Sequence, residues 1–541
     1  ANYRCERYTE SMIRKRAPKE LQIVGLIGSL AFAFPGIYLI WRNFTTGADP
    51  LGLLLAGNTL EPLWRTIRLA FLVSLSAAIL GTALAWCTTR TDLPFARLWR
   101  VILPIPLVFP TFIGAAAFIR TLNPGGLAND AFQSLGLNET PELRGLVGAW
   151  LVLTLFCYPY VYLPVAARLR QLPGSLEQSA LILGDNPLQT FRRVVLRQIA
   201  TSISAGTLLV FLYTISDFGA VQLMRYDTLT RAIESNYLAR PPMAFALSLI
   251  LLILAGAVVL VERSMTRRLP EVDTHRTSLP MMYRLGKWKH VASLFVAATF
   301  ALAVAAPSAA LLDWAADGLI RDQRGGNSLT INVDKVVEAA TNTVSSSALA
   351  AVFALLAVTP IAFLVGRYRD RTGRIAHSVV IATFALPGIL IALSLRFWTL
   401  KSGFFGDLLY DSMALLIFAY VVRFGSLAMG TALVAVRSVP GALHDAAATL
   451  GANKWKQLRT VDLPVMRPGL LAAAGFVLLS TMKELPISLI ISPLGFPTLT
   501  TRIFGSFEDA FVAEAGIMAV TLVCVSALLS WFLVLRRADH L

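Results

Sequence analysis

Few residues of this 541-residue chain have types and spacings that could support chemistry. No Gly-x4-Gly-Lys-[Ser/Thr] phosphate loop occurs in the sequence, since Gly286-Lys287 is followed by Trp288 and lacks the preceding glycine. The histidines have no spacing typical of metal ligands, and the cysteines suggest no disulfide framework. We therefore expect no catalytic residue, no stable metal site and no ATP hydrolysis by this chain. These residues are His275, His290, His377, His444, His540, Cys5, Cys87, Cys157 and Cys524.

Two carboxylates are more informative, because they interrupt apolar stretches. Asp217 and Glu484 lie near the ends of two such stretches. An ionisable group inside a membrane is costly and usually faces a cavity or a partner. The two residues could form a translocation gate suited to a cation. Alternatively, each could be an interfacial carboxylate with local partners, as Lys483 beside Glu484 suggests.

The composition indicates the kind of element that must position these residues. The chain is 56% hydrophobic and 15% charged, with a mean hydropathy of +0.65. A soluble protein is nearer half apolar and a quarter charged, so a soluble enzyme, a disordered protein and a nucleic-acid binder are all excluded. An all-α, polytopic membrane protein fits instead, because each spanning helix needs roughly 20 mainly apolar residues. About 12 spans are predicted, at 21–41, 66–87, 101–119, 146–167, 199–221, 242–262, 291–312, 343–366, 376–398, 413–435, 468–491 and 511–535.

The net charge of +16 is sorted by side. If the N-terminus is inside, the interior segments hold 32 of the 48 Lys and Arg residues and carry about +20, which leaves about −4 elsewhere. Lysine and arginine favour the cytoplasmic side, so both termini are predicted to be cytoplasmic. The first apolar window follows a basic segment and could be a signal peptide, but it is longer than a signal core and is interpreted as an anchor.

Prolines and arginines modify several spans. Pro104, Pro106, Pro110 and Pro387 fall within the third and ninth windows and predict either a helix break lining a path or ordinary kinks. The arginines lie near the predicted outer ends of spans and are expected to snorkel towards water. They are Arg120, Arg396 and Arg423.

An internal repeat relates two long interior loops. Residues 173–197 and 440–464 align without gaps, and 10 of the 25 positions are identical. The alignment continues into the next span, where Asp217 pairs with Glu484. Because both loops face inward, the two halves are parallel and pseudo-symmetric. The predicted organisation is a first half at 1–262 with loop 168–198, a cytoplasmic linker at 263–289, and a second half at 290–541 with loop 437–467.

Each repeated loop is predicted to fold as a short helix, a turn and a second helix. Pro173 and Pro440 can start the first helix. Gly184 and Gly451 can end it in the left-handed conformation. Such a unit suits insertion into a groove of another protein, although an amphipathic segment lying on the membrane is the alternative.

These loops resemble the EAA coupling loop of ABC importer permeases. In the second loop the motif is matched by Asp445-Ala446-Ala447, Gly451 and Leu463-Pro464. The first loop departs from it, with Glu177-Gln178-Ser179-Ala180, Gly184 and Arg197 at the position of the final proline. The resemblance implies that both loops couple to an ATPase. The implied coupling residues are Glu177, Gln178, Ala180, Gly184, Asp445, Ala446, Ala447 and Gly451.

Further segments resemble fused two-half permeases for ferric iron. Ser216-Asp217-Phe218-Gly219 and Lys483-Glu484-Leu485-Pro486 are two of them. The resemblance implies a type I importer permease in a bacterial inner membrane, working by alternating access among membrane lipid. Its implied partners are two copies of a cytoplasmic ATPase subunit, which bind ATP and magnesium, and a periplasmic iron-binding protein.

The nature of the cargo stays open at this point. Thiamine or an oxyanion such as sulfate would suit the same machine, and a twelve-span secondary transporter is a second alternative. The duplicated coupling loops favour the ATP-driven importer.

Overall fold

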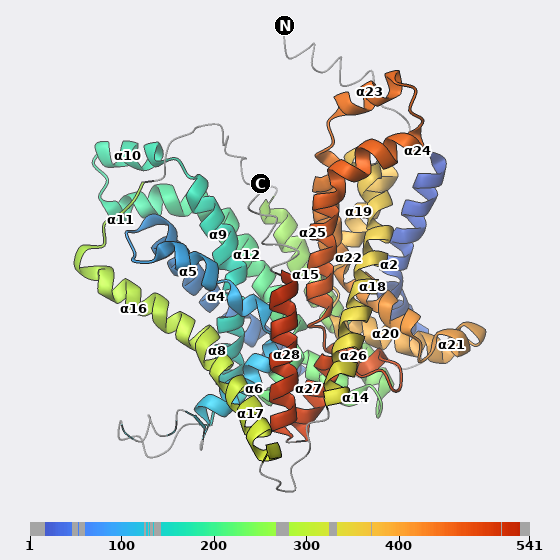
Figure 1. The fold of residues 1–541 in the computed structure, drawn as a ribbon, viewed down its shortest axis with the longest axis horizontal. Coiled ribbons are helices and arrows are strands. Elements are labelled where there is room, and N and C mark those ends of the chain that lie inside the picture. Colours follow the sequence, from blue (N-terminus) through green and yellow to red (C-terminus); the bar gives the residue numbers. More distant parts are fainter. Residues whose placement is uncertain are drawn as a thin grey trace. The chain divides into compact units, whose positions relative to one another are not determined.

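The computed structural model describes residues 17–45, 52, 60–123, 126–127, 129, 134, 142–266, 281–323, 333–368, 370–509 and 511–530. These residues are helical, apart from their connections and one isolated parallel bridge between Thr91 and Tyr283 (Figure 1). Both chain ends and most of the predicted linker, 267–280, lie outside the described residues.

The expected membrane architecture is confirmed. Ten helices are long and apolar enough to span a membrane, and two further helix pairs qualify as bent spans, which gives up to 12. Each of the twelve corresponds to one of the windows predicted from hydrophobicity. The long helices satisfy their own backbone, which is the condition for crossing lipid.

Two of the predicted spans are broken. The pair Ala96–Val108 and Thr111–Leu122 is bent by 100°, and the pair Arg371–Thr383 and Gly388–Lys401 by 103°. Proline precedes the second helix of each pair, at Pro110 and Pro387. Because the proline ring fixes the backbone and removes a donor, it stops one helix and starts the next. The sequence left a helix break and an ordinary kink open at these prolines, and the structure has breaks. That the breaks line a path stays a prediction.

The carbonyls freed by these breaks have side-chain donors. The Tyr158 hydroxyl donates to the carbonyl oxygen of Leu103 at 2.7 Å. Arg423 donates to the carbonyl oxygens of Phe384 and Leu386. Snorkelling of Arg423 was therefore a wrong expectation, since this guanidinium satisfies backbone oxygens that lipid could not.

The described residues form two compact units. Each unit includes a helical segment that is distant in sequence from the rest of that unit. Unit 1 contains the described parts of 1–45, 332–502 and 524–541, and unit 2 those of 46–331 and 503–523. Helix α2 (Lys19–Thr45) thus packs with helices that follow residue 332. The division into halves at 262 and 290 concerns the sequence repeat and stays a prediction.

Small residues allow α2 to approach its partners in unit 1 closely. A Cβ at Gly425 would overlap the ring of Phe32, and one at Gly25 would lie 2.6 Å from Leu364. Phe34 packs edge-on against Trp398, with ring centroids 5.1 Å apart. The N-terminal helix is therefore an integral part of this unit.

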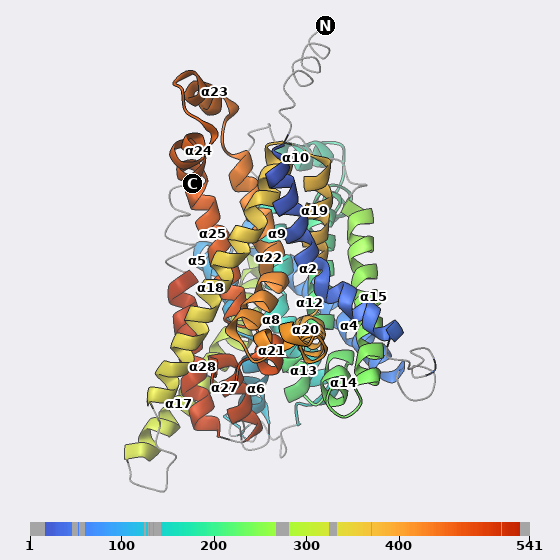
Figure 2. The ribbon, with the colours of Figure 1, turned by 90° about the vertical axis from the view of Figure 1, so that its right-hand side faces the viewer.

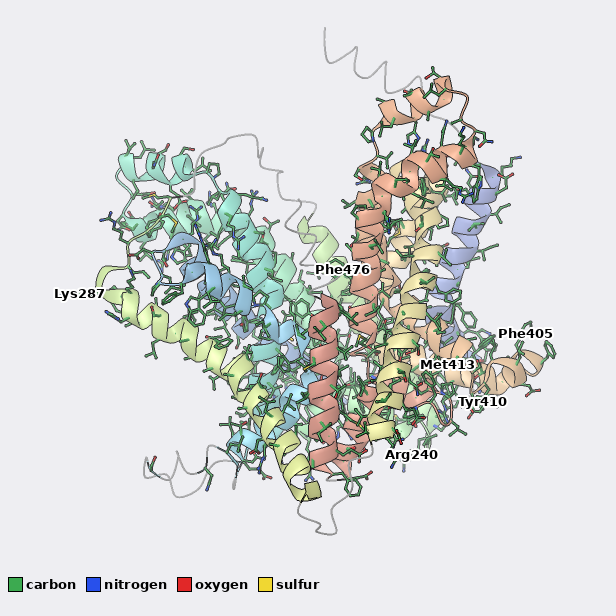
Figure 3. All side chains as sticks on the ribbon, viewed as in Figure 1. Arg240, Lys287, Phe405, Tyr410, Met413 and Phe476 are labelled. Carbon is green, nitrogen blue, oxygen red and sulfur yellow. The ribbon has the colours of Figure 1, made fainter. Side chains whose placement is uncertain are left out.

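Unit 1 is built around α18, which packs on α22, α25 and α19. Helix α21 carries Phe405 away from the other helices of this unit (Figure 3). The helices of this unit are α2, α18 (Val333–Gly366), α19 (Arg371–Thr383), α20 (Gly388–Lys401), α21 (Phe404–Leu409), α22 (Met413–Arg437), α23 (Gly441–Thr449), α24 (Lys454–Gln457), η5 (Leu458–Asp462), α25 (Leu463–Thr481), α26 (Pro486–Ile491), and parts of α27 (Leu499–Glu508) and α28 (Val512–Ser530).

Unit 2 is built around α4, α9 and α12, which pack on one another, and also contains the rest of α27 and α28. The helices of this unit are α4 (Leu60–Arg90), α5 (Ala96–Ile102), η1 (Ile105–Val108), α6 (Thr111–Leu122), α8 (Gly145–Cys157), α9 (Pro159–Gln171), α10 (Gly174–Ile182), α11 (Pro187–Thr190), η2 (Phe191–Val195), α12 (Leu196–Ser216), α13 (Gly219–Leu223), α14 (Leu229–Asn236), α15 (Pro241–Thr266), η3 (Gly286–Trp288), α16 (Lys289–Phe300), η4 (Ala301–Ala305) and α17 (Ala306–Gln323).

A glycine on α4 sets the spacing of this core. A Cβ at Gly81 would lie 2.8 Å from the carbonyl oxygen of Tyr158 and 3.0 Å from the Tyr162 nitrogen, both on the backbone at α9. We expect Gly81→Ala to lower the free energy of unfolding by about 1–3 kcal/mol through overpacking. Thermal unfolding in detergent measures the effect. The control is Gly256→Ala on α15, where no heavy atom of another described segment lies within 4 Å of the added Cβ. Its midpoint of thermal unfolding should not fall. Equal midpoints for both variants would contradict this account.

Candidate functional site

The first repeated loop has the predicted form. Helix α10 ends beside Gly184, which has φ of +95°, and the short helix α11 follows. The Asn186 side chain caps α11, with Oδ1 accepting from the Gln189 amide at 2.9 Å. A π-helical turn, η2, then leads into the span α12.

The second loop repeats this geometry within unit 1. Helix α23 ends beside Gly451, which has φ of +77°, and Asn453 caps α24 by accepting from the Lys456 amide at 2.8 Å. The π-helical turn η5 leads into α25. Both glycines adopt the left-handed conformation that the sequence predicted. Helices α23 and α24 stand beyond the end of α25 in both views (Figure 1, Figure 2).

Apolar side chains are exposed at the tip of each loop. Ile182 and Leu183 are 85% and 87% exposed in the first, and Leu450 and Trp455 are 84% and 66% exposed in the second. The sequence-predicted coupling residues divide by burial. Gln178, Gly184, Asp445, Ala446 and Gly451 are exposed, Ala447 is half-buried, and Glu177 and Ala180 are buried.

Glu177 holds the first loop to the bundle. Its carboxylate pairs with Arg90, the last residue of α4, at 3.0 Å, and neither side chain has any exposed area. The Tyr283 hydroxyl donates to the other carboxylate oxygen at 2.6 Å. A buried charge pair needs such additional donors to offset its loss of hydration.

The second loop is held by a different set of charges. His444, which aligns with Glu177, lies 3.1 Å from the carboxylate of Asp462, and Asp462 also pairs with Arg367 at 3.1 Å. Asp462 aligns with Val195 of the first loop. The carboxylate has therefore moved from the short helix in one loop to the π-helical turn in the other.

The sequence reasoning missed these anchoring partners. Arg90 ends one long apolar helix and Arg367 follows another. An arginine at the end of a long apolar helix in both halves was a signal that could have pointed to them. The exchange of Glu177 and Val195 for His444 and Asp462 was a second signal, visible in the repeat alignment. No sequence signal pointed to Tyr283, because it lies more than a hundred residues from Glu177 in sequence.

Asp217 lies at the break between η1 and α6 in unit 2. One carboxylate oxygen accepts from the Thr111 hydroxyl at 2.5 Å, and Thr111 is the first residue of α6. The other oxygen accepts from the Ala220 amide at 3.0 Å. A helix N-terminus favours a carboxylate, so Asp217 has local structural partners.

Glu484 occupies the corresponding place in unit 1. Its Oε1 atom fills the space that a Cβ on Gly388, the first residue of α20, would need. The pairs Thr111–Asp217 and Gly388–Glu484 are thus complementary in size, since glycine leaves room for the longer acid. Each carboxylate lies at a half-helix start in its own unit, and a gate formed by the two together stays a prediction.

A family model matches this architecture. The model describes a binding-protein-dependent transport system inner membrane component, and it matches residues 77–269 and 358–538. The chain belongs to this family of permeases. It is therefore a multi-pass inner membrane permease of an ABC importer, with two permease domains. Permeases of this family are non-catalytic transport subunits without a cofactor, and they work with an ATP-binding ATPase and a binding protein.

Among its relatives, the permease is similar over most of its length to an Fe(3+)-transport permease. It is 26% identical over 522 residues to the Fe(3+)-transport system permease protein FbpB 2 of Haemophilus influenzae, covering 95% of this chain and 97% of that one. Two others match over shorter stretches. Identity is 30% to a probable molybdenum ABC transporter permease of Haloferax volcanii, over 36% of this chain and 71% of that one. It is 27% to a sulfate transport system permease of Salmonella typhimurium, over 29% and 55%.

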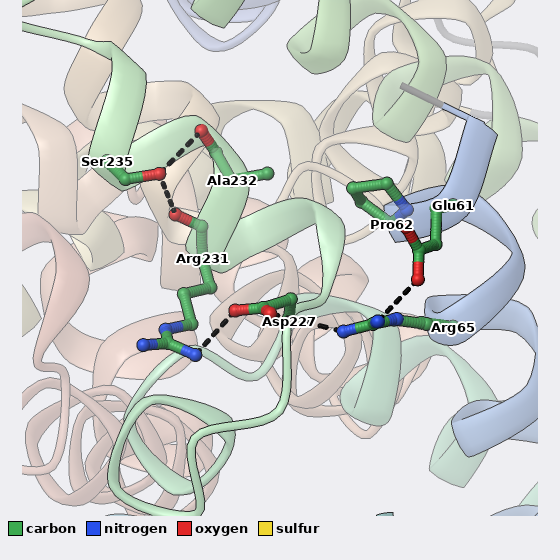
Figure 4. Close-up of a pocket in the computed structure, with 7 residues that line it drawn as sticks. All are labelled: Glu61, Pro62, Arg65, Asp227, Arg231, Ala232 and Ser235. Carbon is green, nitrogen blue, oxygen red and sulfur yellow. Dashed lines mark hydrogen bonds and ion pairs between the residues drawn. The ribbon is translucent and has the colours of Figure 1, made fainter. Parts of the chain in front are cut away.

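A polar pocket of about 370 Å³ lies in unit 2 of the permease, at the opposite end of α4 from Arg90 (Figure 4). Arg65 pairs with Glu61 and with Asp227, the latter at 3.1 Å, and Arg231 also pairs with Asp227. Because two guanidinium groups face two carboxylates, the charges of the described lining residues balance. Nearby on α14, burial and then the Glu508 carboxylate raise the pKa of Glu234 above its ordinary value.

The size complementarity at the helix breaks can be tested by transplanting one pair into the other. We expect Gly388→Thr alone to destabilise the permease, because the new side chain overlaps Glu484. The double variant Gly388→Thr/Glu484→Asp recreates Thr111–Asp217 and should recover part of the loss, with a coupling energy of at least about 1 kcal/mol. Thermal unfolding of the four combinations measures it. Additive effects would show that the two positions do not share one space.

Proposed function

We propose that this permease imports ferric iron delivered by a periplasmic iron-binding protein. The main support for this proposal is the similarity to an Fe(3+)-transport permease over 95% of this chain and 97% of that one. The similarity includes both halves, so it concerns the fused architecture as well as the transport family. The sulfate and molybdenum relatives named above cover 29% and 36% of the chain.

The two repeated loops support a pair of ATPase subunits as the motor. Each loop offers a short helix with exposed apolar residues next to a left-handed glycine, and the two loops have the same fold. An exposed apolar helix suits a groove on a partner protein. One ATPase subunit would therefore bind each loop, and ATP-driven closure of the subunits would tilt the two halves in alternating access.

The distribution of charge supports the orientation of this machine. Interior segments that carry about +20 favour cytoplasmic termini and cytoplasmic coupling loops. The remainder of the chain is mildly negative, at about −4, which does not oppose a cationic cargo. Ferric iron is a hard cation that prefers oxygen ligands, so Asp217 and Glu484 are the proposed gate residues.

Reconstitution tests the cargo directly. The permease is co-produced with its ATPase and binding protein, placed in proteoliposomes, and supplied with radioactive iron on the binding protein. We expect ATP-dependent accumulation of iron that is not reduced by excess sulfate, molybdate or thiamine. Accumulation of one of those compounds in place of iron would overturn the iron assignment while leaving the importer class intact.

The left-handed glycines provide a test of the coupling role. No atom of the described residues lies within 4 Å of a Cβ on Gly184 or Gly451, but an L-residue in that conformation costs roughly 1–2 kcal/mol. We expect Gly184→Ala and Gly451→Ala to lower the iron transported per ATP by distorting the end of the docking helix. The matched control is Gly441→Ala on α23, which has equally open space and no positive φ. Unchanged uptake per ATP in both glycine variants would contradict the docking role.

A further inference from the structure

The end of the segment that joins the two halves is fastened to the first coupling loop. Within the described residues, Tyr283 forms a parallel bridge with Thr91, just beyond the end of α4. The Tyr283 amide donates to the Arg90 carbonyl oxygen at 2.8 Å, and the Asp92 amide donates to the Tyr283 carbonyl oxygen at 3.3 Å. This backbone pairing fixes the position of the Tyr283 side chain.

The Tyr283 side chain reaches the buried carboxylate of the coupling helix. Its hydroxyl donates to Glu177 Oε2 at 2.6 Å, and its ring lies 5.2 Å from the ring of Trp86 on α4. Burial, and then the Glu177 carboxylate, raise the pKa of Tyr283 well above its ordinary value. The hydroxyl therefore stays protonated and donates throughout the physiological pH range.

Arg90 binds two backbone carbonyl oxygens next to the same carboxylate. Its guanidinium donates to the carbonyl oxygen of Met281 at 3.1 Å and to that of Leu172 at 3.2 Å, besides pairing with Glu177. One buried group thus joins the end of α4, the segment before α10, the coupling helix itself and the joining segment.

The following residues secure the joining segment to α16. The Leu285 amide donates to the Asp92 carboxylate at 2.8 Å, which lowers the pKa of Asp92, and Lys289 lies 3.6 Å from the same carboxylate. Lys287, at the start of this region, is labelled in Figure 3. Any displacement of the beginning of α16 would therefore pull on the segment that carries Tyr283.

Charged side chains and a histidine of the described residues anchor the second coupling loop. Among the described residues, Asp462 binds both His444 and Arg367, and all three belong to the second half. Arg367 takes the role of Arg90, and the His444–Asp462 pair takes the role of Glu177. Only the first arrangement, within the described part of the chain, includes a residue of the segment between the halves.

We propose that Tyr283 is a positioning residue for coupling, which holds the first coupling helix through Glu177 and so makes residues 281–283 part of the support of the ATPase docking helix. This inference rests on the proposed ATP-driven transport. Losing the hydroxyl would leave a buried carboxylate oxygen without its donor, so α10 would open more often and transmit less of the ATPase movement.

The primary test compares Tyr283→Phe with Tyr368→Phe in the complete transporter. Tyr368, near the end of α18, makes no side-chain hydrogen bond within the described residues and serves as the control. In Tyr283→Phe we expect hydrogen exchange of residues 174–184 to rise about tenfold, since a hydrogen bond to a charged group is lost. Exchange in residues 441–451 should not change. Transported cargo per ATP should fall at least about threefold, with the ATPase still bound.

A second variant shows whether Tyr283 acts through Glu177. Glu177→His/Val195→Asp builds the second loop's arrangement into the first, where the new aspartate carboxylate would pair with Arg90 and no longer need the tyrosine. In this background Tyr283→Phe should change neither exchange nor coupling. If the background variant does not fold, the exchange and coupling measurements on Tyr283→Phe alone decide.

The outcomes separate this inference from the proposed function. If Tyr283→Phe transports with the wild-type ratio and unchanged exchange in 174–184, the positioning role is overturned while transport stands. A uniform rise of exchange over the whole chain would also overturn it, because that pattern indicates general destabilisation. If the wild-type complex shows no ATP-dependent iron transport, the proposed cargo fails. The exchange measurement still tests the link between Tyr283 and α10.

Discussion

The pairing of Arg90 with Glu177 is the constraint around which the first repeated loop is built. Both side chains are fully buried, so neither charge can recover its hydration from solvent. Removing one partner of such a pair typically costs about 3–5 kcal/mol, because the other charge is left uncompensated. The requirement for further donors and acceptors explains why Tyr283, Met281 and Leu172 converge on this point. Satisfying one buried charge thereby fixes the loop that would meet the ATPase.

The two halves meet the same physical demands with different residues. Each anchors its repeated loop to an arginine at the end of a long span, yet the carboxylate is Glu177 in one half and Asp462 in the other. Each places an acid at the start of a half-helix, with threonine beside the shorter acid and glycine beside the longer one. A duplicated sequence can therefore change single residues as long as charge and volume are conserved at the contact.

The sequence predicted those features that depend on local pattern. The spans follow from apolar runs, the breaks from proline, and the loop geometry from glycine in a repeated motif. The packing of α2 among later helices was not predictable, because it depends on Phe32 and Gly425, which are far apart in the chain. For the same reason Arg423 was expected to snorkel, whereas it binds carbonyl oxygens at a distant break. The anchoring of Glu177 likewise depends on partners at residues 90 and 283.

The membership of α2 in unit 1 has a consequence for biosynthesis. This helix emerges from the ribosome well before its packing partners in unit 1, which begin at Val333, about 290 residues after α2 ends at Thr45. At roughly 5–20 residues per second, α2 would wait in the lipid for about 15–60 seconds before its partners arrive. During that interval Phe32, Phe34 and Tyr38 would face lipid or an insertion factor instead of protein. Unit 1 can therefore be completed only long after α2 has been synthesised. Until then, the face of α2 that carries these aromatic side chains must stay available for packing.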